Sequence, residues 1–304
     1  MPKGLPRVVA ALRRPRAPDP EALRRELARL HRVPTSSLFL THGATEATTL
    51  VLFYLARTLR RSAAPLRCSV ARPEYPPIPG TAELAGFRVV GADRPADVAA
   101  VSQPNNPTGR LWTPGQLEAL ARSRRAVLVD ETFREFTRAP TAAGGPAANV
   151  WIGGSFTKLY GGDDLRVGYV IAPRGAADDF ERFHGLLLDE IPPASVAGAR
   201  ALLRDRGEIL PDVRARLRRN TAVLEEHLPG LAGDGAPVVF DRPGRHPTDG
   251  LGVMALRAGV LVAPGHFFGD RTGVRLGITR PTFPEDLEAY LRVRARWDRP
   301  RTRS

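Results

Sequence analysis

Lys158 is the residue of this chain whose type is best suited to covalent chemistry, because lysine is rare here. The sequence holds 45 residues of the Lys and Arg types, and only Lys3 and Lys158 are lysine. A lysine amine can lose its proton and attack a carbonyl carbon, whereas an arginine guanidinium stays protonated. Ser155, Thr157 and Arg166 lie in the same stretch of twelve residues. An ordinary surface lysine is the alternative, and it is the weaker interpretation in a chain that uses arginine at nearly every other basic position.

Two further polar motifs stand where a helix is expected to begin and where a strand is expected to end. Residues 43–46 (Gly-Ala-Thr-Glu) open a helix, and the N–H groups of a helix start can bind a phosphate. A plain helix cap is the alternative, which this motif taken alone favours. Residues 102–109 (SQPNNPTG) follow a predicted strand. Their two asparagines between prolines either fix one amide toward a ligand or form an ordinary turn.

A pair of acids, Asp130 and Glu131, comes directly after the apolar stretch 126–129. A carboxylate half-buried at the end of a strand stays ionised only beside a cation. The alternative is a helix N-cap or a surface acid. Since ligands of open α/β sheets bind at the carboxyl ends of the strands, the motifs predict one shared site.

The elements that must position these motifs alternate between short apolar stretches and helical segments. This alternation predicts a mostly parallel sheet covered by helices, the α/β class. Strands are expected at residues 66–71, 88–91, 98–102, 126–129, 150–152 and 167–171. Helices are expected at residues 20–31, 45–59, 79–85 and 114–121, and helical patterns dominate from 176 to 228.

The final third of the chain has a different pattern. Strands are expected at residues 237–240, 259–262 and 273–278, and helices at 249–258 and 284–293. This predicts a smaller α+β domain, with a boundary near Arg206. The expected organisation is therefore a short N-terminal arm at 1–17, a large domain at 18–206 and a small C-terminal domain at 207–304.

Composition excludes several classes of protein. With 304 residues, 42% of them hydrophobic and 25% charged, the chain can bury a core and is not expected to be disordered. It has no run of about 20 apolar residues, which a membrane span requires. The N-terminus lacks the apolar region of a secretory signal. Cys68 is the single cysteine, which excludes an internal disulfide and a multi-cysteine metal site. We expect a cytoplasmic protein with no metal in its site.

The net charge of +13 invites the hypothesis of nucleic-acid binding. The arginines are spread along the chain, however, and their densest groups stand in helix-like or tail segments. This distribution favours a solvated basic surface over a nucleic-acid groove.

Taken in order, the motifs resemble those of the fold-type I pyridoxal-phosphate enzymes, in the class I and II aminotransferase group. The strings SFTK, LRVGY and PNNPTG carry the resemblance, which extends from about residue 18 to about 291. Within this group, the branch of the histidinol-phosphate aminotransferases and threonine-phosphate decarboxylases is the most similar.

The resemblance implies a role for each motif. Lys158 would form the internal aldimine with pyridoxal 5′-phosphate and later move the substrate's α-proton. Asp130 would pair with the pyridinium nitrogen and so keep the ring an electron sink. Asn106 would donate to the phenolic oxygen. Tyr75 would stack on the ring, although a core tyrosine is an equal alternative.

The resemblance also implies how the anionic groups would be bound. Arg275 would bind a substrate carboxylate through two parallel hydrogen bonds. The phosphate would be held by Ala44, Thr45, Ser155, Thr157 and Arg166.

Three departures from the group affect the substrate side. Phe133 stands where many relatives carry a tyrosine. Ala17 stands where relatives often have a tyrosine that reaches the partner subunit's phosphate. Asp163 and Asp164 occupy a stretch that is usually neutral and rich in glycine.

The leading functional hypothesis is an aminotransferase that moves an amino group from an amino acid to a 2-oxo acid, as a homodimer in amino-acid biosynthesis. A decarboxylase of the threonine-phosphate type is the alternative within the fold, because pocket geometry decides which substrate bond breaks. A non-catalytic basic binding protein on the same fold is the alternative of another class. The motifs name neither donor nor acceptor.

Overall fold

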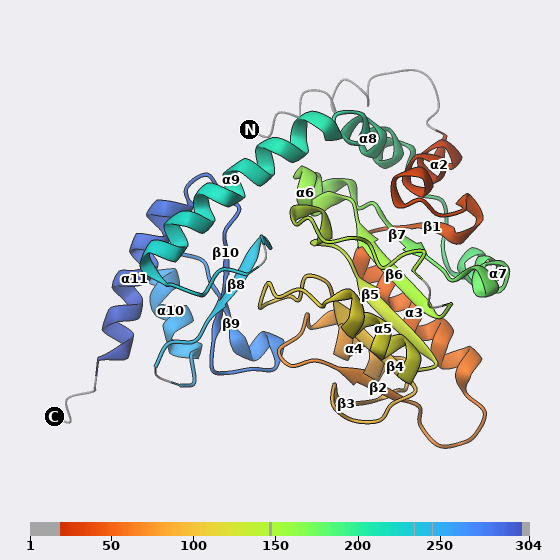
Figure 1. Cartoon of the computed structure of the whole chain (residues 1–304), viewed down its shortest axis with the longest axis horizontal. Coiled ribbons are helices and arrows are strands. Elements are labelled where there is room, and N and C mark those ends of the chain that lie inside the picture. Colours follow the sequence, from red (N-terminus) through yellow and green to blue (C-terminus); the bar gives the residue numbers. More distant parts are fainter. Residues whose placement is uncertain (1–18, 146–147, 234, 245, 300–304) are drawn as a thin grey trace.

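A computed structural model describes residues 19–145, 148–233, 235–244 and 246–299, apart from the side chain of Thr157. The expected arm at 1–17, with Ala17, therefore lies outside the described residues. Figure 1 shows a larger part built around one sheet and a smaller part built around another. The long helix α9 (Arg206–His227) extends from the larger part to the smaller. Within the described chain, no helix has the length and apolar character needed to cross a membrane.

The larger part contains a seven-stranded sheet in the order β1–β7–β6–β5–β4–β2–β3. The five strands from β6 to β3 run parallel, whereas β7 is antiparallel to both β6 and β1. This confirms the predicted α/β class with a mostly parallel sheet. The strands are β1 (Leu38–Thr41), β2 (Arg67–Val70), β3 (Arg88–Gly91), β4 (Val98–Ser102), β5 (Ala126–Asp130), β6 (Val150–Ser155) and β7 (Gly168–Ile171).

The central strands β4 and β5 are apolar up to their last residue because helices cover both faces of the sheet. Along β5, Val127 and Val129 face one core, while Ala126 and Leu128 face the other. Strands buried on both faces are nearly continuous apolar runs, as β4 and β5 are here. The covering helices are α2 (Pro20–His31), α3 (Ala44–Leu59), α4 (Pro77–Leu84), α5 (Pro114–Ser123), α7 (Ala177–Leu187) and α8 (Pro193–Arg204).

The helix starts follow the capping signals in the sequence. Helix α2 begins where expected, because the Asp19 side chain accepts from the N–H of Glu21 and Pro20 occupies the first turn. Helix α5 begins with a capping box between Thr113 and Gln116. Short helices complete the larger part: α6 (Thr157–Tyr160), η1 (Thr35–Ser37), η2 (Arg134–Phe136), η3 (Asp163–Leu165) and η4 (Arg174–Ala176).

Strand β1 lies where no strand is expected from the sequence. Its four residues, Leu-Phe-Leu-Thr, are all buried, so they lack the alternation that marks a half-exposed strand. They pair with β7, which is more than 120 residues away along the chain. No local sequence pattern predicts pairing between segments this far apart.

The smaller part contains a three-stranded antiparallel sheet in the order β8–β10–β9. Its strands are β8 (Val238–Asp241), β9 (Ala263–Pro264) and β10 (Val274–Gly277). Its helices are α10 (Asp249–Arg257), α11 (Phe283–Asp298) and η5 (Gly265–Phe268).

The strand expected at residues 259–262 is wrong. Gly259 has a φ of 80° and donates to the carbonyl of Leu256, while Val260 donates to the carbonyl of Ala255. These bonds complete the end of α10, so the N–H groups are not available for a sheet. Strand β10 pairs with the two residues of β9 in their place.

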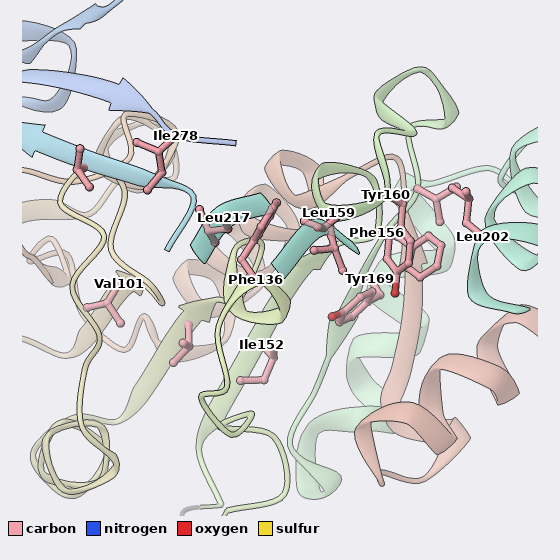
Figure 2. Packing of buried hydrophobic residues seen from close by; sticks show 14 of the residues in the cluster. Val101, Phe136, Ile152, Phe156, Leu159, Tyr160, Tyr169, Leu202, Leu217 and Ile278 are labelled. Atoms are coloured by element: carbon pink, nitrogen blue, oxygen red, sulfur yellow. The ribbon is translucent and has the colours of Figure 1, made fainter. Parts of the chain in front are cut away.

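One apolar cluster joins the two parts. Figure 2 shows Ile152 of the large sheet near Phe136, with Leu217 of α9 close by and Ile278, just after β10, at the far side of the view. Leu202 of α8 closes the cluster at its other end. Residues of both parts also line a cavity beside this cluster.

Candidate active site

A cavity of about 450 Å³ opens at the carboxyl edge of the large sheet and is lined by residues of both parts. Strand register brings two of its lining residues together, because Ser102 of β4 lies opposite Asp130 of β5. Asp130 in turn lies opposite Gly153 of β6, the strand that ends in the lining residue Ser155. The structure brings nine of the ten predicted site residues to this cavity: Ala44, Thr45, Tyr75, Asn106, Asp130, Ser155, Lys158, Arg166 and Arg275. The tenth, Thr157, is the first residue of α6, and its side chain is not described.

Lys158 lies in α6, directly after the carboxyl end of β6. Its Nζ is 3.2 Å from Oδ1 of Asp163, and both side chains are about half exposed. Asp163 therefore faces the lysine within the cavity, whereas Asp164 is exposed and is not among the lining residues. An ion pair this exposed contributes little to stability, so the amine can leave it to react.

Asp130 is buried at the end of β5. Its Oδ1 accepts from the N–H of Thr132 at 2.9 Å and also from the Thr132 hydroxyl. Burial raises the pKa of Asp130, and the two Thr132 hydrogen bonds oppose that rise. None of the ion pairs in the described residues includes Asp130, although it lines the cavity. The site therefore offers a buried carboxyl to a cationic group of a ligand.

Arg166 and the start of α3 form an anion-binding site in the cavity. Gly43 has a φ of 99°, which residues with side chains rarely adopt, and no side chain caps the helix that starts at Ala44. Its first N–H groups and the helix dipole therefore favour an anion where Ala44 and Thr45 line the cavity. The guanidinium of Arg166 reaches the same place, donating to the carbonyl of His42 at 3.3 Å.

Arg275 of β10 reaches the cavity from the smaller part and contacts Asn106. Its Nη1 donates to Oδ1 of Asn106 at 3.0 Å, and its guanidinium lies 5.1 Å from the ring centre of Phe268. Because the Asn106 oxygen accepts from Arg275, its NH₂ group is left to donate. No ion pair of the described residues includes Arg275, and burial lowers the pKa of Arg275. This guanidinium can bind a ligand carboxylate.

Aromatic rings wall the cavity. Tyr75 lines it beside Asn106, and Phe133 and Phe136 line it with ring centres 6.0 Å apart. Phe133 stands where a tyrosine is common in the group that the sequence resembles, and it lines the cavity with an apolar ring that carries no hydroxyl.

Sequence reasoning missed four polar residues at this site. Ser102, Thr132 and Thr279 line the cavity, and Glu74 is buried directly behind Tyr75. Burial raises the pKa of Glu74 to about 7. The string Pro73-Glu74-Tyr75 contained the signal, an acid between a proline and an aromatic residue, but nothing local shows that the acid is buried.

Together these side chains supply an amine that can attack a carbonyl, a buried carboxyl for a cation and two separate anion sites. This set suits an anionic carbonyl compound with a basic ring nitrogen, together with a substrate carboxylate. Among the described residues, no group of three or more His, Cys, Asp or Glu side chains is placed to hold a metal ion.

Comparison with known proteins gives concordant matches. The model of the family described as aminotransferase class I and II matches residues 15–279. A histidinol-phosphate aminotransferase of Symbiobacterium thermophilum is 31% identical over 94% of this chain and 87% of its own length. An aspartate aminotransferase of Thermococcus kodakarensis is 34% identical over 65% of this chain, and that match spans 56% of the relative.

The fold has close counterparts among solved structures. A probable N-succinyldiaminopimelate aminotransferase from Thermus thermophilus superposes with a TM-score of 0.78, at 22% identity, over 97% of this chain and 91% of that one. At this identity the likeness concerns the fold.

Proposed function

The chain belongs to the family of class I and II aminotransferases, and from this premise we propose that its cavity transfers an amino group from an amino acid to a 2-oxo acid with pyridoxal 5′-phosphate as cofactor. One observation carries the proposal. Lys158, Asp130 and Arg275, from three distant parts of the sequence, line one cavity. A protein that used this fold only to bind a partner would have no need of that convergence.

The residues present fit the cofactor. Asp130 lacks an ion-pair partner among the described residues and can accept a hydrogen bond from the protonated ring nitrogen. Arg166 and the start of α3 can hold the phosphate, and the NH₂ group of Asn106 can donate to the phenolic oxygen. When bound, pyridoxal phosphate supplies an aldehyde carbon and a ring that accepts the electron pair left on the substrate's Cα.

Lys158 carries the proton transfer in this proposal. As a neutral amine, its Nζ would hold the cofactor at the aldehyde carbon, whose oxygen would be lost as water, and would give up that place to the substrate amine. The freed Nζ would then be the base that takes the proton from the substrate's Cα and holds it for return to the cofactor's aldehyde carbon. Asp163, 3.2 Å from Nζ, stabilises the amine whenever it is protonated.

Arg275 orients the substrate. A carboxylate bound by its guanidinium places the amino group of the same molecule toward Lys158, which lines the same cavity. We therefore propose donors that carry a carboxylate. The names of the relatives, aspartate and histidinol-phosphate aminotransferase, suggest amino-acid biosynthesis as the process.

The protein's organisation belongs to the same proposal. We place a large domain at residues 18–206 and a small one at 207–304, which the start of α9 at Arg206 supports. A homodimer is supported by Leu186 and Leu187, whose apolar side chains are 78% and 55% exposed at the end of α7. A cytoplasmic location is supported by the single cysteine, which is buried.

The experiment that tests the function is an absorbance spectrum of the purified protein with pyridoxal phosphate, followed by half-reactions with each amino acid. A donor is identified when it removes the absorption band of the lysine-bound cofactor. If no amino acid changes the spectrum, amino-group transfer from amino acids is contradicted.

A further inference from the structure

Glu74 is a buried carboxyl that the proposed reaction does not use. It lies in the loop between β2 and α4, between Pro73 and Tyr75, and its exposed fraction is 2%. No ion pair in the described part of the chain includes it. A buried acid without a cation is costly, so the contacts that replace the cation show what the residue does.

Three hydrogen-bond donors replace the cation. The N–H of Tyr75 donates to Oε1 at 2.7 Å, and the N–H of Ser102 donates to Oε2 at 3.1 Å. The hydroxyl of Ser102 also donates to Oε1. Both Tyr75 and Ser102 line the cavity, so Glu74 fixes two lining residues although it does not line the cavity itself.

Hydrogen bonds connect Ser102 in turn with Asn106 and Arg275. The Ser102 hydroxyl oxygen accepts from the N–H of Asn106 at 2.8 Å, and the side-chain oxygen of Asn106 accepts from Arg275 at 3.0 Å. Glu74 is thus connected, through Ser102 and then through the backbone and side chain of Asn106, with the residue proposed to bind the substrate carboxylate.

A second connection reaches Arg275 from the other side. The N–H of Glu74 donates to the carbonyl of Phe268 at 3.2 Å, and the Phe268 ring lies 5.1 Å from the Arg275 guanidinium. Glu74 therefore contacts the larger part through its side chain and the smaller part through its backbone.

We propose that Glu74 is a positioning residue, which fixes Tyr75, Asn106 and Arg275 relative to one another and so sets the cofactor and substrate sites as one unit. This inference rests on the proposed function. It goes beyond that function by assigning a task to a residue that touches neither cofactor nor substrate.

The donor set explains why a carboxylate stands here. The Ser102 oxygen accepts from Asn106, so its own proton must go to an acceptor, and Glu74 accepts that proton together with two N–H groups. A glutamine would offer one oxygen and turn an NH₂ group toward donors. Burial raises the pKa of Glu74 to about 7, with the charge of Asp130 adding to the rise, so the carboxylate is kept at a cost to folding.

The test compares Glu74→Ala, Glu74→Gln and Ser102→Ala with the wild-type protein. Two quantities are measured: the Kd of pyridoxal phosphate for the cofactor-free protein, and KM and kcat for a carboxylate donor. We expect Glu74→Ala to raise the cofactor Kd and the donor KM roughly 10-fold to 100-fold, because buried donors lose their acceptor. Glu74→Gln, which keeps one acceptor, should restore part of both.

The double variant Glu74→Ala/Ser102→Ala shows whether the two residues act as a unit. If Glu74 and Ser102 act as a unit, the cofactor Kd of the double variant should be close to that of the more affected single variant. A double variant whose fold-change in Kd equals the product of the two single fold-changes would overturn the proposal. Where Glu74→Ala fails to fold, Ser102→Ala decides. An elevated Kd supports the connection, and an unchanged Kd contradicts it.

Glu131→Gln is the matched control, because Glu131 is a buried carboxyl of 3% exposure that binds Arg134 and the loop at 141–142. Its cofactor Kd should stay within about twofold of the wild type, since those partners do not line the cavity. Wild-type protein that does not bind pyridoxal phosphate contradicts the proposed function. Wild-type protein that binds it, with Glu74→Ala unaffected in Kd and KM, contradicts this inference alone.

Discussion

The two sheets that meet at the cavity contribute to it in different ways. At the carboxyl edge of the seven-stranded sheet, strand register aligns Ser102, Asp130 and Gly153, so several positions are fixed at once. The three-stranded sheet contributes one charged side chain, Arg275, which is held by a hydrogen bond to Asn106 and by the Phe268 ring. Residues fixed by register suit a cofactor that stays bound, whereas a single residue that reaches across suits a substrate that comes and goes.

This difference predicts two kinds of variant. Changes at the large sheet should alter cofactor binding and the reaction itself, while changes on the small sheet should alter substrate binding. Glu74 contacts both parts, so its variants should alter both.

Lys158→Ala should lower turnover by at least about 10⁴-fold, because the only described amine nucleophile of the cavity is lost. Lys158→Arg is the matched control, since it keeps a positive charge near Asp163 but cannot attack a carbonyl. Borohydride reduction followed by mass spectrometry measures the covalent cofactor. A reducible adduct on either variant would show that another residue binds it.

Asp130→Ala should lower kcat by roughly 10²-fold to 10³-fold, because a positioned charge that acts on the reacting group is removed. Glu131→Ala should change kcat far less per folded molecule, since Glu131 binds Arg134 and the loop at 141–142. Steady-state kinetics on both variants, with circular dichroism to count folded protein, measure the contrast. Equal losses of kcat at the two positions would contradict the role proposed for Asp130.

The sequence predicted the large sheet and its motifs better than the small part, and the reason is physical. Strands such as β4 and β5 are unbroken apolar runs that end in polar residues, so pattern alone locates both strand and site. The strand expected at residues 259–262 had the right composition, but the end of α10 uses its N–H groups. Local pattern does not reveal which backbone groups are already bonded.

Tertiary contacts account for what the sequence missed at the site. Asp163 could have pointed away from the cavity, and only the fold places it 3.2 Å from Lys158. In the sequence, Glu74 looks like one more charged loop residue. Its buried carboxylate is hydrogen-bonded by Ser102, which is 28 residues further along the chain. The roles given to the site residues remain predictions that the variants test.

The boundary between the two regions should be sensitive to pH through Glu74. Its pKa is raised from 4.5 to about 7 by burial, so between these values the folded protein holds a proton that the unfolded chain has lost. The free energy of unfolding therefore falls as pH rises through this window, by on the order of 3 kcal/mol. Denaturant unfolding of cofactor-free protein at pH 5 and pH 7.5 measures the fall. Glu74→Gln, which does not titrate, should show a smaller fall, and an equal fall would contradict a raised pKa.

Arg275→Lys tests the small sheet and should have the smallest effect on the cofactor. Lysine keeps the charge but loses the planar pair of N–H donors, so KM for a carboxylate donor should rise about 10-fold. The cofactor Kd should change less than about threefold, because Asn106 keeps a cation beside its oxygen and the large sheet is untouched.

Amine donors that lack a carboxylate provide the control, since their KM should not respond to the change. If KM for carboxylate donors is unaltered, Arg275 does not bind the substrate. If the cofactor Kd rises as much as KM, the two sheets do not divide the work between cofactor and substrate.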